Sequence, residues 1–329
     1  MICYIYRKRE GIYFSIEKIF SGIAGIIGKQ VAVSDAHVPF SRLLPQNIFR
    51  NLQYVRRLKA DIYHITGDAH YLALGLPGRH TVLTIHDCVF MYQSSGLKKR
   101  ILKWLFLDAP VKRCRLITTI SDASKRDIIR FTGCPAEKIV VIPNPVSDAI
   151  VFRERPFNMH QPVLLFIGST PNKNLDRVIE AVQGFACRLD IVGIIPPEAE
   201  QKLAQYGIIY QRYWQLSEEE LAGRYAAADI VVFPSTFEGF GLPVIEAQKA
   251  GRPVLTSRIS PMQEVAGDGA CLVDPHDVQS IRAGIQSLIT HAAYRENLVQ
   301  KGFSNVQQYT KEAVAKRYMK VYESMQKPE

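Results

Sequence analysis

The feature that most constrains this chain is a regular alternation of short apolar segments with amphipathic helices. This alternation predicts parallel β-sheets flanked by helices. One series of predicted strands lies near 2–6, 30–34, 61–66, 81–85, 115–120 and 138–142, and a second lies near 162–168, 187–193, 207–212, 230–233, 253–256 and 270–273. Between them, Pro143, Asn144 and Pro145 break both helix and strand. The predicted fold is therefore α/β, with two doubly wound parallel-sheet domains.

The linker sets the domain boundaries. Residues 1–145 form the predicted first domain and residues 146–310 the second, with helices near 276–291 and 311–325 at the end. A chain of 329 residues is long enough for two hydrophobic cores. We expect the two domains to face each other across a cleft.

Composition narrows the class of protein. The chain is 47% hydrophobic and 22% charged, as soluble globular proteins are. No segment approaches the roughly 18 apolar residues that span a bilayer, and the start MICYIYRKRE makes a poor signal peptide. The six cysteines are scattered and form no CxxC pair, so neither a metal site nor a disulfide framework is expected. We expect a cytoplasmic protein.

The positive charge is concentrated in the first half. Residues 1–145 contain 22 Lys and Arg against 10 Asp and Glu, whereas the remaining residues contain 19 against 21. Two readings are open: attraction to an anionic surface or acceptor, or a solvated basic face with no partner.

The segment GLKKRILKWLFLDAPVKRCR, residues 96–115, has a basic face interleaved with Ile, Leu, Trp and Phe. Such a helix can lie on an anionic membrane surface. The alternative, slightly favoured by the sequence, is an amphipathic helix that faces the core and leaves its lysines in solvent.

The stretch STFEGFGLPVIEA, residues 235–247, predicts an anion-binding turn. It follows a short buried strand, and Gly239 and Gly241 let a ligand approach the backbone. Pro243 suits the start of a helix that should end near Gly251. Free amides and the helix dipole at this turn favour a phosphate.

Two glutamates bracket this turn. A carboxylate repels a diphosphate but accepts strong hydrogen bonds from hydroxyl groups. Glu238 and Glu246 therefore suit a ligand with phosphates in its middle and hydroxyl groups at both ends, as in a nucleotide sugar. For Glu246 alone, a favourable charge in the first helical turn is a sufficient explanation.

Further polar residues follow other predicted strands, where ligands of doubly wound sheets bind. In the first domain these loops hold Arg7–Gly11, Gly67–His70, His86–Asp87 and Ser121–Asp122, and in the second they hold Gly168–Asn174.

Taken together, these stretches resemble those of a family-4 (group 1) retaining glycosyltransferase of GT-B type. The similarity is carried by ITTISDASKRDIIRFTGCPAEKIVVIPNPV, FIGSTPNKNLDRVIEAV, LSEEELAGRYAAADIVVFPSTFEGFGLPVIEAQKAGRPVLTS and VDPHD, and more loosely by VLTIHD and HITGDAHY. EGFGLPVIE matches the family's Glu-x7-Glu motif. The resemblance implies two Rossmann-like domains, with the helix at 311–325 packed back on the first.

The resemblance also implies residue roles. Glu246 would bind the ribose of the donor nucleotide, Glu238 would contact the transferred sugar, Lys173 would stabilise the departing diphosphate, and His86 would contact the sugar from the acceptor domain. The donor-binding residues would be Gly168, Ser169, Lys173, Glu238, Gly239, Phe240, Gly241, Leu242 and Glu246. The acceptor-side candidates are Asp68, His70, Asp87 and Ser121.

One position departs from the family pattern. Many relatives have an arginine where this chain has Ser169, so one cation for the diphosphate is missing. Arg7, Lys8 and Arg9 are candidates to replace it. The chain has no Asp-x-Asp motif, and a lysine with a helix N-terminus can stabilise a leaving diphosphate without a metal. We therefore expect metal-independent transfer without a cofactor.

The sequence thus predicts transfer of a sugar from a nucleotide-diphosphate sugar to a glycan or lipid-linked glycan, in bacterial lipopolysaccharide, O-antigen or capsule synthesis. The expected place is the cytoplasm or the inner membrane face, with contact to anionic membrane through the basic first domain and no nucleic-acid partner. The alternative is a non-catalytic GT-B subunit that binds a sugar nucleotide and regulates or scaffolds a partner. A dinucleotide-dependent oxidoreductase is disfavoured because no G-x-G-x-x-G follows either first strand.

Overall fold

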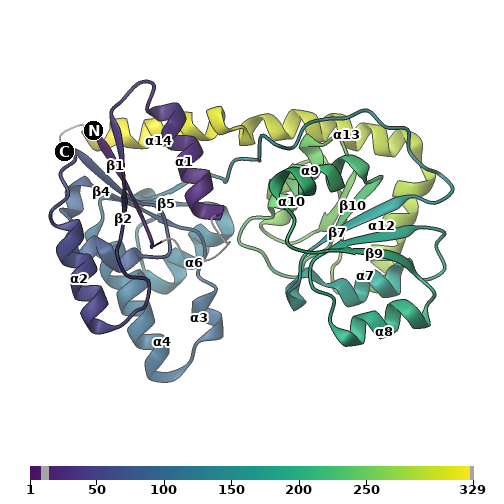
Figure 1. The fold of residues 1–329 in the computed structure, drawn as a ribbon, viewed down its shortest axis with the longest axis horizontal. Helices are drawn as coiled ribbons and strands as arrows, with labels where there is room; N and C mark the ends of the chain where they lie inside the picture. Colours follow the sequence, from purple (N-terminus) through teal and green to yellow (C-terminus); the bar gives the residue numbers. More distant parts are fainter. Residues whose placement is uncertain (9–14, 327–329) are drawn as a thin grey trace. The chain divides into compact units, whose positions relative to one another are not determined.

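The computed structural model describes residues 1–8 and 15–326 (Figure 1). The chain divides into two compact units, one made of Met1–Pro145 with Lys311–Glu329, and the other of Val146–Thr310. Each unit contains one six-stranded sheet in which all paired strands are parallel. This confirms the predicted α/β class with two parallel sheets.

The first sheet has the strand order β2-β1-β3-β4-β5-β6. Its strands are β1 (Ile2–Tyr6), β2 (Val33–His37), β3 (Ile62–Ile65), β4 (Thr81–Ile85), β5 (Leu116–Thr119) and β6 (Ile139–Val141). The helices of this unit are α1 (Ser15–Ile27), α2 (Pro45–Val55), α3 (Phe90–Gln93), α4 (Gly96–Lys103), α5 (Ala109–Arg113), α6 (Asp122–Thr132) and α14 (Lys311–Gln326). Short helical turns are η1 (His70–Gly75), η2 (Gly78–His80), η4 (Ala136–Lys138) and the π-helical η3 (Trp104–Asp108).

The second sheet has the order β12-β11-β10-β7-β8-β9. Its strands are β7 (Val163–Ile167), β8 (Arg188–Val192), β9 (Ile209–Tyr213), β10 (Ile230–Phe233), β11 (Val254–Ser257) and β12 (Cys271–Val273). Its helices are α7 (Leu175–Val182), α8 (Pro197–Gln205), α9 (Glu218–Ala227), α10 (Leu242–Lys249), α11 (Met262–Ala266), α12 (Val278–Thr290) and α13 (Ala292–Val306), with short turns η5 (Pro171–Lys173) and η6 (Gln307–Tyr309).

Strand order reverses once in each sheet, between β1 and β3 in the first and between β7 and β10 in the second. At such a switch point the two neighbouring loops leave the sheet in opposite directions and open a crevice beyond the carboxyl ends of the strands. The loops after β1, β3, β7 and β10 are therefore where the topology favours a ligand.

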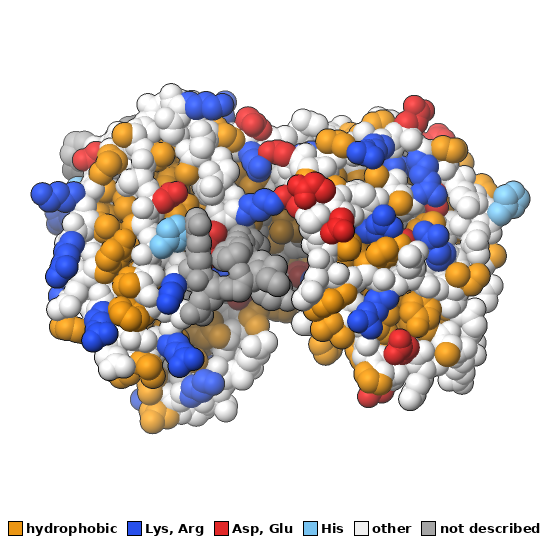
Figure 2. Space-filling model, in the orientation of Figure 1, with side chains coloured by type: hydrophobic (Ala, Val, Ile, Leu, Met, Phe, Trp, Pro, Cys, Tyr) orange, Lys and Arg blue, Asp and Glu red, His pale blue; other side chains and the backbone are white. Residues whose placement is uncertain are grey.

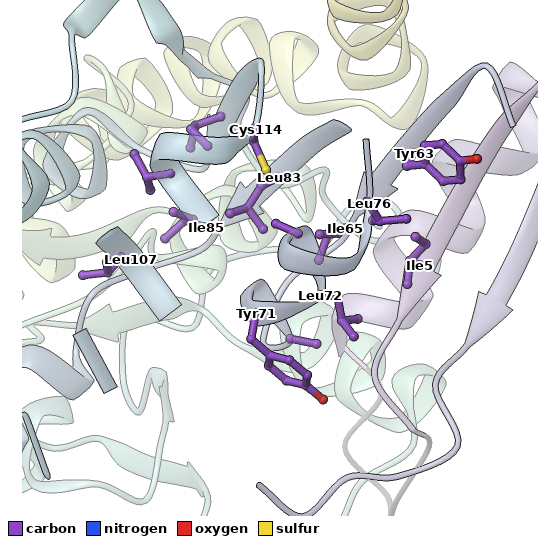
Figure 3. Packing of buried hydrophobic residues seen from close by; sticks show 14 of the residues in the cluster. Ile5, Tyr63, Ile65, Tyr71, Leu72, Leu76, Leu83, Ile85, Leu107 and Cys114 are labelled. Atoms are coloured by element: carbon purple, nitrogen blue, oxygen red, sulfur yellow. The ribbon is translucent and has the colours of Figure 1, made fainter. Parts of the chain in front are cut away.

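The central strands are buried on both faces. β1 and β4 are buried at every position, as are β3 and β10. Near-continuous Ile, Val and Leu runs suit strands covered by helices on both sides. Figure 3 shows part of the first core: Cys114 lies beside Leu83, and Leu107 belongs to the same buried cluster as Ile85 and Leu72. The second half of segment 96–115 thus faces the core.

The first half of that segment does not. No residue of α4, which the structure describes throughout, is buried. The slightly favoured reading of one core-facing helix over 96–115 is therefore wrong for residues 96–103, because only the part from η3 onward reaches the core, through Leu107, Pro110 and Val111.

A polar network in the first unit holds α14 against the sheet. His64 on β3 bonds to Tyr322 Oη on α14 (2.6 Å) and to Thr84 Oγ1 on β4 (2.7 Å). Tyr322 in turn donates to Tyr4 Oη (3.1 Å). All of these side chains are buried, and α14 runs beside α1 over the same cluster (Figure 1). Satisfied buried bonds of this kind fix one arrangement of the packed elements.

The network makes the first unit sensitive to acid. Burial lowers the pKa of His64 from its ordinary 6.5 to about 3. The unfolded chain therefore takes up a proton that the folded chain refuses as pH falls below 6.5, and the free energy of unfolding decreases in the window from 6.5 to about 3. We expect this effect of His64 to lower the free energy of unfolding by about 2 kcal/mol between pH 6.5 and 5. Urea denaturation across this range measures the loss.

The matched variant is His64→Gln, which keeps a polar side chain that cannot titrate. Between pH 6.5 and about 3, its free energy of unfolding should fall less steeply than that of the wild-type chain. The difference in slope should equal the contribution of one bound proton. Equal slopes for the two proteins would contradict the assignment of this acid sensitivity to His64.

Candidate active site

The loops after β7 and β10 are fastened to each other in the second unit. Thr236 N donates to Asn172 O (2.8 Å), and Asn172 Nδ2 donates to Phe237 O (2.8 Å). Asn174 is buried in the left-handed conformation (φ 71°) and donates to Pro234 O (2.9 Å) and Pro275 O (2.6 Å). These bonds fix the loop that holds Lys173 against the loop that holds Glu238.

Lys173 and Glu238 form an ion pair across this switch point. Lys173 Nζ lies 2.6 Å from Glu238 Oε1, and the two side chains are 21% and 13% exposed. Ser235 Oγ donates to the same carboxylate oxygen (2.6 Å), and the Phe233 ring lies under the ammonium group, 4.8 Å from its centroid. Ser235 and Phe233 thus hold the ion pair in place, and both of its side chains remain partly accessible to solvent.

Gly168 makes room for Lys173. It has φ +144°, and a Cβ atom built on it would lie 2.2 Å from Lys173 Cγ. Ser169, the next residue, accepts a hydrogen bond from Ile194 N (2.8 Å) and so joins the loop after β7 to the loop after β8. Ser169 is exposed, and its hydroxyl hydrogen remains a donor that a phosphate oxygen accepts.

Gly168→Ala is expected to displace Lys173. The added methyl group meets the lysine near its base, and the backbone angle is one that alanine avoids, so the free energy of unfolding should fall by about 2 kcal/mol and nucleotide binding should weaken. Gly184→Ala is the matched control, since Gly184 also has positive φ (+79°) but no heavy atom within 4 Å of the place that a Cβ would take. Thermal unfolding and calorimetric titration compare the two; equal behaviour would contradict the packing argument.

Glu246 lies on α10, whose N-terminus follows the turn at Gly239–Gly241. The helix begins at Leu242 after Gly241 with φ 107°, and Pro243 stands in its first turn. The first amides of a helix have no intrahelical acceptor and attract anions. Phe240 is buried with its ring edge-on to Tyr309, 5.8 Å between centroids, so its side chain anchors the turn.

Tyr225 on α9 positions the Glu246 carboxylate. The buried Tyr225 Oη donates to Glu246 Oε2 at 2.6 Å. Burial raises the pKa of Glu246, and the hydrogen bond from Tyr225 opposes that rise. Sequence reasoning missed Tyr225, and it placed Asn174 in a candidate loop without the bonds that join this loop to the next; a tyrosine within a helix and an asparagine beside a lysine carry no signal of the loops that they reach.

In the first unit, an ion pair also spans the switch point. Arg7 after β1 binds Asp68 Oδ2 after β3 (2.5 Å) and, through Nε, Glu17 Oε1 (2.9 Å). Two carboxylates therefore already engage Arg7, one of the cations suggested in place of the missing arginine. Lys8 is exposed, and Arg9 lies outside the described residues.

His86 packs on a glycine as Lys173 does. Gly67 has φ +144°, and a Cβ there would lie 2.7 Å from His86 Cδ2. His86 Nε2 donates to Thr66 O (2.9 Å), which leaves Nδ1 as an acceptor in the neutral ring. Burial lowers the pKa of His86, although Thr66, Asp68 and Asp87 oppose the shift. We infer a neutral ring at pH 7.

The acceptor-side candidates separate into two groups. Asp68, His70, His86 and Asp87 line one cavity of about 280 Å³, whose other walls are Leu43, Phe90, Leu102 and Phe106. Within it, Asp87 Oδ1 accepts from Val89 N (2.9 Å), and His70 Nδ1 donates to Phe106 O (2.6 Å). Burial lowers the pKa of His70. Ser121 is not among these lining residues: it is buried, and its Oγ accepts from Ser124 N (3.1 Å) as the N-cap of α6.

A second cavity of about 360 Å³ shares Asp68 and Leu43 with the first and is lined further by Arg7, Lys8, Val38, Phe40, Ser41, Ala69 and Tyr71. Both cavities therefore combine charged or polar side chains with apolar ones. Among the residues that the structure describes, no three His, Cys, Asp or Glu side chains gather as ligands of a metal ion.

Comparisons with known proteins cover most of the chain. The model of "Glycosyl transferases group 1" matches residues 148–304, and that of "Glycosyltransferase Family 4" matches residues 25–149. The O-antigen chain mannosyltransferase B of Escherichia coli is 29% identical over 305 residues, which are 82% of this chain and 75% of that protein. The O-antigen chain mannosyltransferase RfbU of Salmonella typhimurium is 29% identical over 222 residues, 64% of this chain and 61% of that protein.

Solved structures share the fold. HepE of Anabaena in complex with UDP and glucose superposes with a TM-score of 0.76 at 16% identity, over 98% of this chain and 99% of that chain. At that identity the likeness speaks for the fold alone.

Proposed function

The chain belongs to the group 1 glycosyltransferases of GT-B type, and from that premise we propose that it transfers a sugar from a nucleotide-diphosphate donor, with retention of configuration and without a metal. The acceptor in this proposal is a glycan or lipid-linked glycan of a bacterial surface polysaccharide. The O-antigen mannosyltransferases among its relatives support that class of acceptor. HepE, which shares the fold, was solved in complex with UDP and glucose.

The observation that carries the donor assignment is the set of groups at the β7/β10 switch point. It combines a cation, Lys173, with a carboxylate, Glu238, at 2.6 Å and with the N-terminus of α10, on which Glu246 lies. Hydroxyl groups suit the two carboxylates, and a diphosphate suits the lysine and the helix amides. A nucleotide sugar offers these groups in the same molecule.

The proposed reaction breaks the bond between the anomeric carbon and the diphosphate oxygen and forms a bond from that carbon to an acceptor oxygen. Negative charge grows on the leaving diphosphate, where Lys173 and the α10 amides stabilise it. The acceptor hydroxyl loses its proton either to the leaving phosphate or to Asp68 or Asp87 as a base. Lys173 and the helix dipole supply the positive charge that a metal supplies elsewhere, and this is the basis for the metal-independent proposal.

The first unit supplies the acceptor-binding groups in this proposal. Asp68 and Asp87 offer acceptors for sugar hydroxyls, and neutral His86 offers Nδ1 to the transferred sugar. None of the helices in the described part of the chain is long and apolar enough to cross a bilayer. We propose that the protein acts at the inner face of the membrane and contacts it through the basic first unit.

The experiment is an assay with a nucleotide sugar and a polysaccharide-precursor acceptor, with the anomeric configuration of the product read by NMR. Retention and equal rates with and without EDTA are expected. Inversion, or loss of transfer in EDTA that a divalent ion restores, would overturn the mechanism. Nucleotide binding without any turnover would favour the alternative of a non-catalytic, sugar-nucleotide-binding subunit that regulates or scaffolds a partner.

A further inference from the structure

Helix α4 presents large apolar side chains to solvent. Leu97, Ile101 and Trp104 are 71%, 55% and 56% exposed. Their i, i+4, i+7 spacing places them on one side of the helix, and Trp104 begins the π-helical turn that continues α4 directly. Since α4 buries none of its residues, this ridge contributes little to the core of its unit. Exposed apolar surfaces of this kind mark sites of interaction with a partner or a membrane.

Cations flank the ridge. Lys98 and Arg100 are exposed, and Lys103 pairs with Asp108 at 2.8 Å. Trp104 itself lines a groove of about 580 Å³, whose other lining residues include Leu74, Arg79, Lys112 and Arg113. Figure 2 shows lysine and arginine side chains interspersed with hydrophobic ones over the end of the first unit where Figure 1 labels α4. Apolar side chains between cations are typical of a surface that lies in the interface of an anionic bilayer.

The charge of this region favours a bilayer over a second copy. Residues 1–145 contain 22 Lys and Arg against 10 Asp and Glu. Two copies joined through α4 would bring the two sets of cations together, which costs free energy. An anionic bilayer offers the opposite charge to the cations and an apolar interior to the ridge.

The same helix also borders the acceptor region. Leu102, between the exposed positions, lines the cavity that holds Asp68, His86 and Asp87, and Phe90 and Phe106 extend its apolar wall. One short helix therefore has exposed apolar side chains on one side and a wall of the candidate acceptor cavity on the other.

We propose that α4 and Trp104 dock the first unit on an anionic membrane, and that the apolar wall of Leu43, Phe90, Leu102 and Phe106 takes the lipid end of a membrane-held acceptor. Asp68, His86 and Asp87 then meet the glycan end of that acceptor. This inference rests on the proposed function for the identity of the acceptor, while the docking surface stands on α4 itself.

The test is co-sedimentation of the full chain with vesicles of phosphatidylglycerol and phosphatidylcholine in equal amounts, and with vesicles of phosphatidylcholine alone. The wild-type chain should bind the anionic vesicles and lose binding in high salt. Ile101→Gln combined with Trp104→Gln should weaken binding by about tenfold or more. Ile209→Gln is the matched control, because Ile209 lies in the second unit and is also 55% exposed; it should bind as the wild type does.

Charge reversal isolates the electrostatic part. Lys98→Glu with Arg100→Glu should weaken binding to the anionic vesicles by more than about 25-fold, because loss of each cation costs about fivefold and the added carboxylates are repelled by the anionic surface. Lys301→Glu, an exposed position of the second unit, should have little effect. A second readout uses the two tryptophans of the chain: in a Trp214→Phe background, Trp104 emission should shift to the blue when anionic vesicles are added.

Three results would overturn the docking surface: equal binding of the α4 variants and the wild type, equal binding to neutral vesicles, or a dimer in the absence of lipid that Ile101→Gln dissociates. Nucleotide binding, measured on the same samples, separates this inference from the proposed function. Vesicle binding without nucleotide binding would contradict the donor site and leave the docking surface intact, and the reverse result would contradict the docking surface alone.

Discussion

Lys173→Met is expected to lower kcat by about 10²- to 10³-fold, the loss that follows removal of one group that stabilises developing charge. In the ligand-free chain Lys173 already pairs with Glu238 at 2.6 Å, so its charge is largely neutralised before the donor binds. Its full value is realised only when negative charge grows on the leaving diphosphate. Interactions made in the transition state raise kcat more than they lower KM. We therefore expect KM to change far less than kcat in steady-state transfer assays.

Lys202→Met is the matched control for Lys173→Met. Lys202 on α8 also pairs with carboxylates, Glu180 at 3.0 Å and Asp176 at 3.4 Å, but it belongs to no loop of the candidate site. The Lys202→Met substitution removes the same charge and also breaks an ion pair. Because an exposed pair contributes little, kcat should stay within about twofold of the wild-type value. A change in kcat as small for Lys173→Met as for Lys202→Met would remove Lys173 from the mechanism.

The second large effect concerns Glu238→Gln, which should lower transfer by about 10- to 100-fold, the value of a hydrogen bond to a charged group. The same substitution releases Lys173 from its ion pair. A nucleoside diphosphate without a sugar should consequently bind as tightly as to the wild-type chain, or more tightly. Calorimetric titration with the nucleotide and a transfer assay with the sugar donor measure the two effects separately.

Glu219→Gln, on the exposed side of α9, serves as the control for Glu238→Gln. The pattern that would contradict this role of Glu238 is a parallel loss of nucleotide binding and transfer in Glu238→Gln. That result would place Glu238 on the nucleotide instead of the transferred sugar.

The fold was predictable from the sequence because buried parallel strands and their helices leave a strong periodic signal. The exception among the strands is instructive. A strand near 30–34 was predicted from the apolar run around Val31 and Val33, but β2 occupies Val33–His37. β2 is an edge strand of its sheet and is mostly half-exposed. It therefore contains polar residues, and a search for apolar runs does not detect it.

The site was predictable only in part, because spacing along the chain reports motifs and not partners. The loops holding Glu238 and Lys173 could be proposed from glycines and strand ends. Their ion pair, and the bond from Tyr225 to Glu246, join residues far apart in sequence and leave no local pattern. For the same reason, the sequence could not tell that Arg7 is engaged by Asp68 and Glu17, or that α4 leaves its apolar side exposed.

The measurement that most directly tests the donor site is a titration of the wild-type chain and Glu246→Ala with UDP, GDP, dTDP and ADP, with and without EDTA. We predict that one of these nucleotides binds the wild-type chain regardless of EDTA and that Glu246→Ala weakens its binding by at least about tenfold, as expected for loss of hydrogen bonds to a charged group. If none of the four binds, or if Glu246→Ala binds as the wild type does, the donor site is not where Lys173, Glu238 and the N-terminus of α10 place it.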